Sequence, residues 1–122
     1  MLPGWIDAHV HLASGFGKDG RFGSSKGTPE EMAYQEASNA WVTLLAGFTT
    51  IQSVGSPANI PLRDTIAKGL LPGPRILTSA EPLTGMGEKT GTPDEIRSYV
   101  RKQREVGALS KSSRQAACGR KA

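Results

Sequence analysis

The chain has 122 residues, 37% of them hydrophobic, with 15 Gly and 8 Pro, which predicts one domain, or part of one, rich in loops. Its formal charge of +4 belongs to the end of the chain, because residues 1–106 balance 11 Lys and Arg with 11 Asp and Glu. The single cysteine, Cys118, excludes an internal disulfide framework. No apolar run reaches the length of a membrane span or resembles a signal peptide, so we expect a soluble chain of unknown compartment.

The first predicted element is a short buried strand over residues 2–12, LPGWIDAHVHL, which carries both histidines of the chain. Side chains alternate along a strand, so Asp7, His9 and His11 are expected on one face and the apolar residues between them on the other. Imidazoles about 7 Å apart along the backbone could converge on one divalent ion. Two solvated or core histidines at a strand end are the alternative.

A polar, glycine-rich loop is predicted next, over residues 13–27. Residues 15–20, GFGKDG, formally match the G-x-G-x-x-G pattern of dinucleotide sites. In those sites the glycines open a helix directly, whereas no helix is expected here for several residues. The segment is therefore interpreted as a flexible active-site loop, or simply as a loop, and no cofactor-binding residue is assigned to it.

Two segments share a strong helix-start pattern, TPEE at residues 28–31 and TPDE at residues 92–95. In each, a threonine can cap the helix, proline suits the first turn and the acids favour the positive end of the helix dipole. The first helix is predicted to end at Gly47 and to place Trp41 in the core. The second is predicted to end near Gly107, with basic side chains on a solvated face.

Short β-branched runs predict two more strands, at residues 48–54 and 75–78, and a short helix is predicted between them at about residues 60–68. A long polar loop is expected over residues 80–91. The alternation of strands and helices predicts an α/β fold with a parallel sheet and right-handed crossovers. Residues 109–122 are basic and lack the pattern of a fourth strand, so we expect a disordered tail.

The opening LPGWIDAHVHL resembles the first barrel strand of the metal-dependent amidohydrolase superfamily, L-P-G-x-I-D-x-H-x-H. Four later segments resemble the joins and elements that follow in that family: residues 45–51 (LAGFTTI), 62–69 (LRDTIAKG), 73–79 (GPRILTS) and 91–108. The similarity is greatest to the imidazolonepropionase-like and prolidase-like branch. It covers about residues 2–108, and leaves residues 109–122 as a non-homologous tail.

This resemblance implies the opening three β/α units of a (β/α)8 barrel, incomplete in the chain as given. It implies one or two divalent ions, usually zinc, with His9 and His11 as the two first-strand ligands. The implied reaction is hydrolysis of an amide C–N bond of a small cyclic amide or dipeptide by metal-activated water. Specificity loops follow the later strands of such barrels, so the substrate is not readable here.

The chain departs from the family pattern after its third strand. The family's bridging lysine, two further histidines and an aspartate belong to strands four to eight. Lys111 lies near the expected lysine, but Ser110 and Ser112 flank it where the family has Ile or Val, so the role is not transferred and no catalytic residue is assigned. A frameshift before the tail is one hypothesis, which the coding DNA would test. We therefore expect the chain to be inactive alone.

Two other interpretations remain open. A non-catalytic small α/β domain could bind a polyanion or a partner protein through its basic tail. Four positive charges without aromatic residues between them are weak evidence for nucleic-acid binding. Neither nucleic acid nor a membrane is expected as a partner. A stand-alone domain could also leave both histidines idle. An open parallel sheet exposes its edges, so a homo-oligomer formed through those edges is a further expectation.

Overall fold

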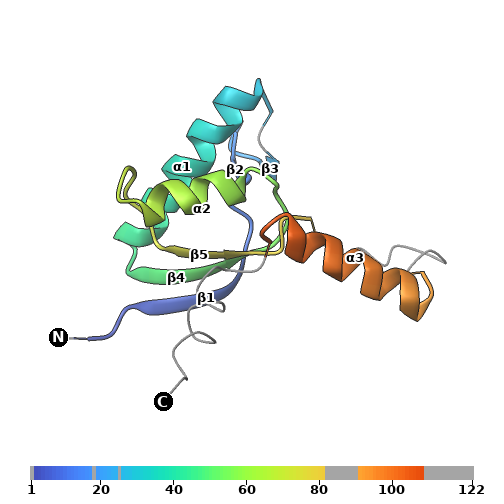
Figure 1. Cartoon of the computed structure of the whole chain (residues 1–122). Coiled ribbons are helices and arrows are strands. Elements are labelled where there is room, and N and C mark those ends of the chain that lie inside the picture. Colours follow the sequence, from blue (N-terminus) through green and yellow to red (C-terminus); the bar gives the residue numbers. More distant parts are fainter. Residues whose placement is uncertain (1, 18, 25, 82–90, 109–122) are drawn as a thin grey trace, which may run out of the picture.

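A computed structural model of the chain describes residues 2–17, 19–24, 26–81 and 91–108 (Figure 1). In chain order its elements are β1 (Trp5–Val10), β2 (Ser14–Phe16), β3 (Phe22–Ser24), α1 (Pro29–Leu45), β4 (Phe48–Ser53), α2 (Asn59–Ala67), β5 (Arg75–Thr78) and α3 (Pro93–Glu105). The predicted loop over residues 80–91 lies mostly, and the predicted tail over residues 109–122 entirely, outside the described residues.

The main sheet has three parallel strands in the order β1-β4-β5, so strands that follow one another through a helix are also neighbours in space. Helices α1 and α2 cover one face of this sheet (Figure 1). Sequential parallel strands joined by helices are the repeating unit of a (β/α)8 barrel. The predicted α/β fold with a parallel sheet is confirmed.

A small core lies between the sheet and the two helices. Ile51 of β4 pairs with Ile76 of β5, and both are buried against Ala40 of α1 and Leu62 of α2. Trp41, which was predicted to lie in the core, is 41% exposed. That prediction is wrong because only a narrow stripe of α1, centred on Ala40, faces the sheet and α2.

The predicted helix starts are confirmed in atomic detail. Thr28 and Thr92 each accept a hydrogen bond from the backbone N–H three residues later, and Glu31 and Glu95 each accept one from the capping threonine's own N–H. Both helices therefore begin with a complete capping box, which satisfies two otherwise unpaired donors.

Strand β1 is an exposed edge strand, whereas a buried strand was predicted. Trp5 is 66% exposed and Ile6 is 73% exposed. Within the described part of the chain, β4 is the only strand that pairs with β1, and its outer edge has no neighbour. The apolar residues of β1 would suit a buried strand with a neighbour on each side, and the described residues provide a neighbour on one side only. The other edge is free, as expected from the sequence.

The pairing of β1 with β4 is irregular, whereas the predicted alternation of side chains assumes a regular strand. Asp7 pairs with Ile51 and Val10 pairs with Ser53, so three steps along β1 match two steps along β4. Trp5 pairs with Phe48 and Ile6 pairs with Thr50, so one step along β1 matches two steps along β4 at the start of the strand. The β-bulge between Asp7 and Val10 adds one residue to β1 just before the histidine turn.

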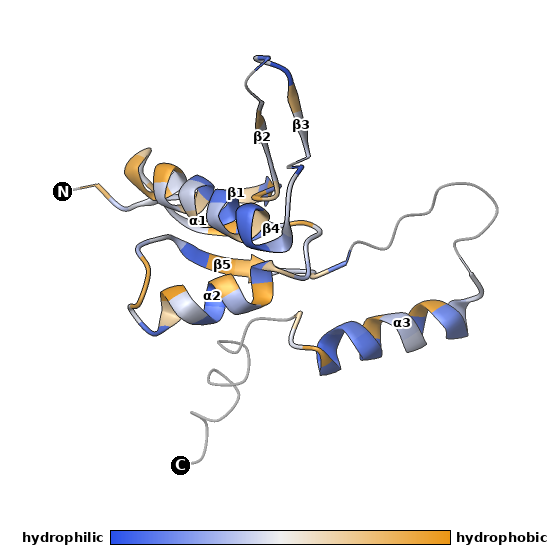
Figure 2. Ribbon diagram, turned by 90° about the horizontal axis from the view of Figure 1, so that it is seen from above, coloured by the Kyte–Doolittle hydropathy of each residue, from blue (hydrophilic) through white to orange (hydrophobic). Residues whose placement is uncertain are grey.

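The segment after β1 forms an antiparallel hairpin instead of the predicted loop. Strands β2 and β3 pair Ser14 with Ser24 and Phe16 with Phe22, and the two phenylalanine rings meet edge to face with centroids 5.6 Å apart. Figure 2 shows this hairpin projecting away from β5 and α2. Three-residue strands that contain glycine carry too weak an alternation to be predicted.

Helix α3 projects from the sheet (Figure 1) and has no buried residue. Its end is held by Arg63 of α2, whose Nη1 donates to the carbonyl oxygen of Gly107 at 2.6 Å. Arg63 is 7% exposed and also forms an ion pair with Asp64. None of the described helices combines the length and hydrophobicity that crossing a membrane requires.

Candidate metal centre

The two histidines come together at the carboxyl end of β1. The Nε2 atoms of His9 and His11 lie 3.2 Å apart, and the ring centroids are 5.1 Å apart with the planes at 72°. Both side chains are exposed to solvent. The convergence predicted from the His-x-His spacing is present, even though β1 pairs irregularly with β4.

Backbone hydrogen bonds fix the chain on both sides of this pair. The carbonyl oxygen of Val10 accepts from Val54 N–H at 2.8 Å, which extends the pairing of β1 with β4. The carbonyl oxygen of His11 accepts from Ser14 N–H at 3.0 Å, which closes a tight turn. Asp7 Oδ1 accepts from the backbone N–H of His9 at 3.0 Å, so that carboxylate supports the bulge.

Helix α1 holds the same turn from the other side. The Asn39 side-chain amide donates to the carbonyl oxygens of Leu12 and Ser14, at 2.8 and 3.0 Å. One side chain thus satisfies two carbonyls of a segment outside the sheet, which would otherwise need water. The position of His11 depends on α1 as well as on β1.

The spacing of the two imidazoles fits a shared zinc ion. Zinc binds histidine nitrogen at about 2.0–2.1 Å, so two nitrogens 3.2 Å apart subtend an angle of about 103° at the ion, close to the tetrahedral value of about 109°. The same separation also suits a hydrogen bond in which one ring donates and the other accepts. A nitrogen that binds zinc, or that accepts the hydrogen bond, must be unprotonated.

The described residues supply only this pair of ligands. Among them, no group of three or more His, Cys, Asp or Glu side chains is placed to hold a metal ion. Lys111 and Cys118 lie outside the described residues. A catalytic zinc usually has three protein ligands, so the pair is half of such a site.

A second polar cluster, which was not predicted from the sequence, lies between α1, the turn after β4 and the start of α2. Glu36 of α1 is 2% exposed and accepts hydrogen bonds from Ser56 Oγ at 2.9 Å and from Asn59 Nδ2 at 2.7 Å. These two hydrogen bonds connect α1 to the turn after β4 and to the start of α2. The signal was available: Glu36 lies four residues before Ala40, on the helix stripe that faces the core.

Comparison with known proteins identifies the fold. The model of the amidohydrolase family matches residues 1–116, nearly the whole chain and eight residues of the predicted tail, 109–116. The chain belongs to the amidohydrolase family. Among curated protein sequences, none matches it significantly.

Several solved structures are similar in fold to this chain. One is a Xaa-Pro dipeptidase crystallised with methionine in its active site, with 30% identity and a TM-score of 0.62 over 87% of this chain. Another, from Bifidobacterium longum, is provisionally classed as a prolidase, with 31% identity and a TM-score of 0.65 over 86% of this chain. A further amidohydrolase is similar in fold at 22% identity.

The chain spans 32% and 24% of the first two structures, so it corresponds to about a third of the length of one and a quarter of the other. The predicted relationship to prolidase-like amidohydrolases is confirmed. The fold is therefore a partial barrel of amidohydrolase type. Amidohydrolases are typically metal-dependent hydrolases, which agrees with a histidine pair at the carboxyl end of the first strand.

Proposed function

We propose that this chain supplies the two first-strand zinc ligands, His9 and His11, of a hydrolase that cleaves an amide C–N bond in a dipeptide or a small cyclic amide. The observation that carries the proposal is the 3.2 Å separation of the two Nε2 atoms at the carboxyl end of β1. The amidohydrolase match and the similarity to a Xaa-Pro dipeptidase support it.

A bound zinc ion polarises a substrate carbonyl and lowers the pKa of a coordinated water. The residues of this chain orient the ligands. The bulge held by Asp7 and the turn held by Asn39 fix the backbone on either side of the histidines, which leaves less backbone freedom to be lost on binding. Both rings must present unprotonated Nε2 atoms, so metal binding weakens as the histidines protonate in acid.

Catalysis requires more ligands than the described residues hold. Two imidazoles bind an ion without fixing the geometry that a hydrolytic zinc needs. We therefore expect the isolated chain to bind zinc weakly and to leave amide substrates intact. In an assembled barrel, the same pair would form one side of the site at the mouth of the barrel.

The test is zinc content and zinc affinity of the full chain, measured by elemental analysis and titration calorimetry. With zinc in excess we expect weak binding that saturates at about one zinc per chain and is lost in His9→Ala and in His11→Ala, because one remaining imidazole is a poor site. Cys118→Ser is the matched control, since the thiol is the other soft ligand in the sequence.

Either of two results would contradict the proposal. Unchanged zinc content in both histidine variants would show that the pair does not bind the ion. Loss of zinc in Cys118→Ser alone would assign binding to the tail. Circular dichroism of each variant shows whether the fold is retained, and both histidines are exposed, so we expect it to be.

A further inference from the structure

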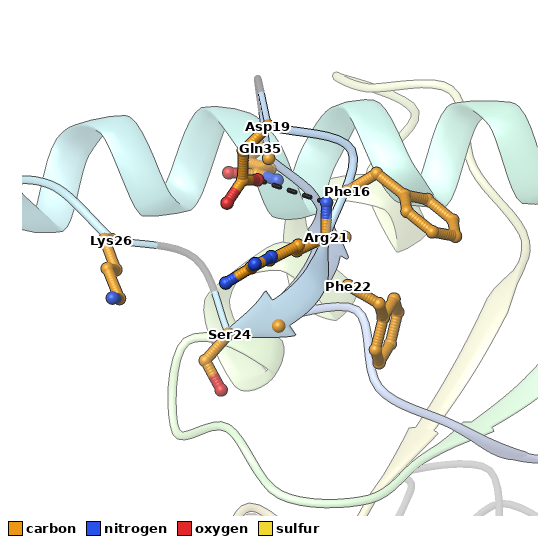
Figure 3. A pocket seen from close by; sticks show the side chains of 10 residues that line it. Phe16, Asp19, Arg21, Phe22, Ser24, Lys26 and Gln35 are labelled. Carbon is orange, nitrogen blue, oxygen red and sulfur yellow. Dashed lines mark hydrogen bonds between the residues drawn. The ribbon is translucent and has the colours of Figure 1, made fainter.

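The hairpin that follows the histidine turn encloses a hollow of about 600 Å³ against α1. Its walls come from both strands of the hairpin, from the turn between them and from Gln35 of α1 (Figure 3). The Phe16 and Phe22 rings lie on one side of the hollow, and polar and charged side chains lie on the other. The hollow therefore has an apolar side and a polar side.

Two cations and one carboxylate line the polar side, and the two cations form no ion pair within the described residues. The Arg21 guanidinium extends into the space between Lys26 and Ser24 in Figure 3. Within residues 2–17, 19–24, 26–81 and 91–108, neither the guanidinium nor the Lys26 ammonium forms a hydrogen bond or an ion pair. Two like charges facing one space favour an anion between them.

The acidic residue in the wall is already engaged. Asp19 Oδ1 accepts a hydrogen bond from the backbone N–H of Arg21 at 3.1 Å, and it stabilises the hairpin turn. Asp19 therefore holds the backbone of Arg21 while the guanidinium remains available. The Gln35 amide and the Ser24 hydroxyl add uncharged hydrogen-bonding groups to the same walls.

We propose that this hollow is a binding subsite for the carboxylate group of a small organic molecule. A guanidinium presents two parallel N–H donors that match the two oxygens of a planar carboxylate, and an ammonium adds a point charge. The phenylalanine pair offers apolar surface to the rest of the molecule. Inorganic phosphate has similar acceptor oxygens, and the test separates the two anions.

The subsite narrows the substrate class of the proposed hydrolase to molecules with a free carboxylate, and this narrowing rests on the proposed function. The hairpin begins two residues after the Leu12 that follows His11, and Ser14 N–H is bonded to the His11 carbonyl oxygen. A carboxylate bound in the hairpin that follows the histidine turn favours a substrate with a free carboxylate, such as a dipeptide, over an uncharged cyclic amide.

The experiment is a titration of the full chain, freed of metal with EDTA and then exchanged into an EDTA-free, low-salt buffer, followed by the backbone amide NMR signals of Gly15, Gly17 and Gly23. The probes are N-acetylglycine, its uncharged amide N-acetylglycinamide, and inorganic phosphate. We expect N-acetylglycine to shift these signals with millimolar affinity, since the site is open to solvent. We expect the uncharged amide to have no effect.

Single substitutions of the cations test whether N-acetylglycine binds in this hollow. Arg21→Gln is expected to weaken N-acetylglycine binding by about tenfold, the usual size of one lost charge-assisted pair. Lys26→Gln is expected to weaken it by a smaller factor. Lys68→Gln, which removes an exposed cation at the end of α2, is the matched control and should leave binding unchanged.

The outcomes are decisive in each direction. Binding of N-acetylglycine that requires its charge and Arg21 supports the proposal. Binding of phosphate alone, binding of no probe, or equal weakening by Lys68→Gln overturns it. Because the chain is metal-free throughout, failure here leaves the histidine proposal intact, and loss of zinc binding leaves this test unaffected.

Discussion

Replacement of Glu36 tests the buried cluster that joins α1 to the start of α2. Glu36→Ala removes the acceptor of two hydrogen bonds, from Ser56 Oγ at 2.9 Å and from Asn59 Nδ2 at 2.7 Å. Bonds to a charged group contribute about 1.5–3 kcal/mol each, so the loss is about 3–6 kcal/mol before relief of the carboxylate's desolvation. We expect a net loss of about 2–4 kcal/mol in the free energy of unfolding, a large share for a small domain.

Glu36→Gln removes the negative charge at this position and keeps the shape of the side chain. The amide oxygen of the new side chain would keep the Ser56 bond, while its amide nitrogen would face the Asn59 amide nitrogen, donor to donor. Asn59 is fully buried, and within the described residues its Oδ1 has no partner. Turning the Asn59 amide over would bring Oδ1 to the new donor, so we expect a loss below about 1.5 kcal/mol.

The assay is urea unfolding followed by far-UV circular dichroism, with Ser38→Ala, an exposed change on α1, as the control. The expected order of stability is wild type and Ser38→Ala first, Glu36→Gln next and Glu36→Ala last. Equal losses in the two Glu36 variants would contradict this prediction. Asn59 can form a hydrogen bond with the amide of Glu36→Gln but not with the methyl group of Glu36→Ala. No loss in Glu36→Ala would contradict the prediction as well.

Two further perturbations concern α3. The Thr92 backbone N–H, with a smaller contribution from the Thr92 hydroxyl, lowers the pKa of Glu95 below its ordinary 4.5. A carboxyl group whose pKa is lower in the folded than in the unfolded state stabilises the folded state at a pH above its unfolded-state pKa. This stabilisation is lost as the pH falls through the folded-state pKa. Helicity of α3 should therefore decrease in acid in the wild type and change less in Glu95→Gln; equal acid responses would contradict this. Arg63→Gln removes the 2.6 Å bond to Gly107, and we expect amide exchange in the last turn of α3 to speed up about tenfold, with Arg101→Gln as an exposed control that leaves it unchanged.

Local chemistry made the helices and two of the strands predictable. The capping boxes at Thr28 and Thr92 need only four consecutive residues, and a short β-branched run is enough to indicate β4 or β5. The histidine pair was found for the same reason, because His9 and His11 are two residues apart. Signals contained within a few residues survive in any tertiary context.

The features that could not be predicted depend on partners distant in sequence. The bulge in β1 is set by its register with β4, which pairs Asp7 with Ile51 and Val10 with Ser53. The exposure of Ile6 depends on what packs against β1, and within the described residues only β4 pairs with that strand. Burial of Glu36 depends on donors that lie 20 and 23 residues further along the chain.

The clamp formed by Asn39 has a consequence for how this part of the molecule can evolve. Because one helix side chain fixes the carbonyls of Leu12 and Ser14, the chain is anchored at the point where it leaves the histidine turn. Everything between that anchor and the capped start of α1 can lengthen, shorten or change sequence without moving the histidines. The hairpin can therefore vary in length and sequence while the histidine pair stays in place.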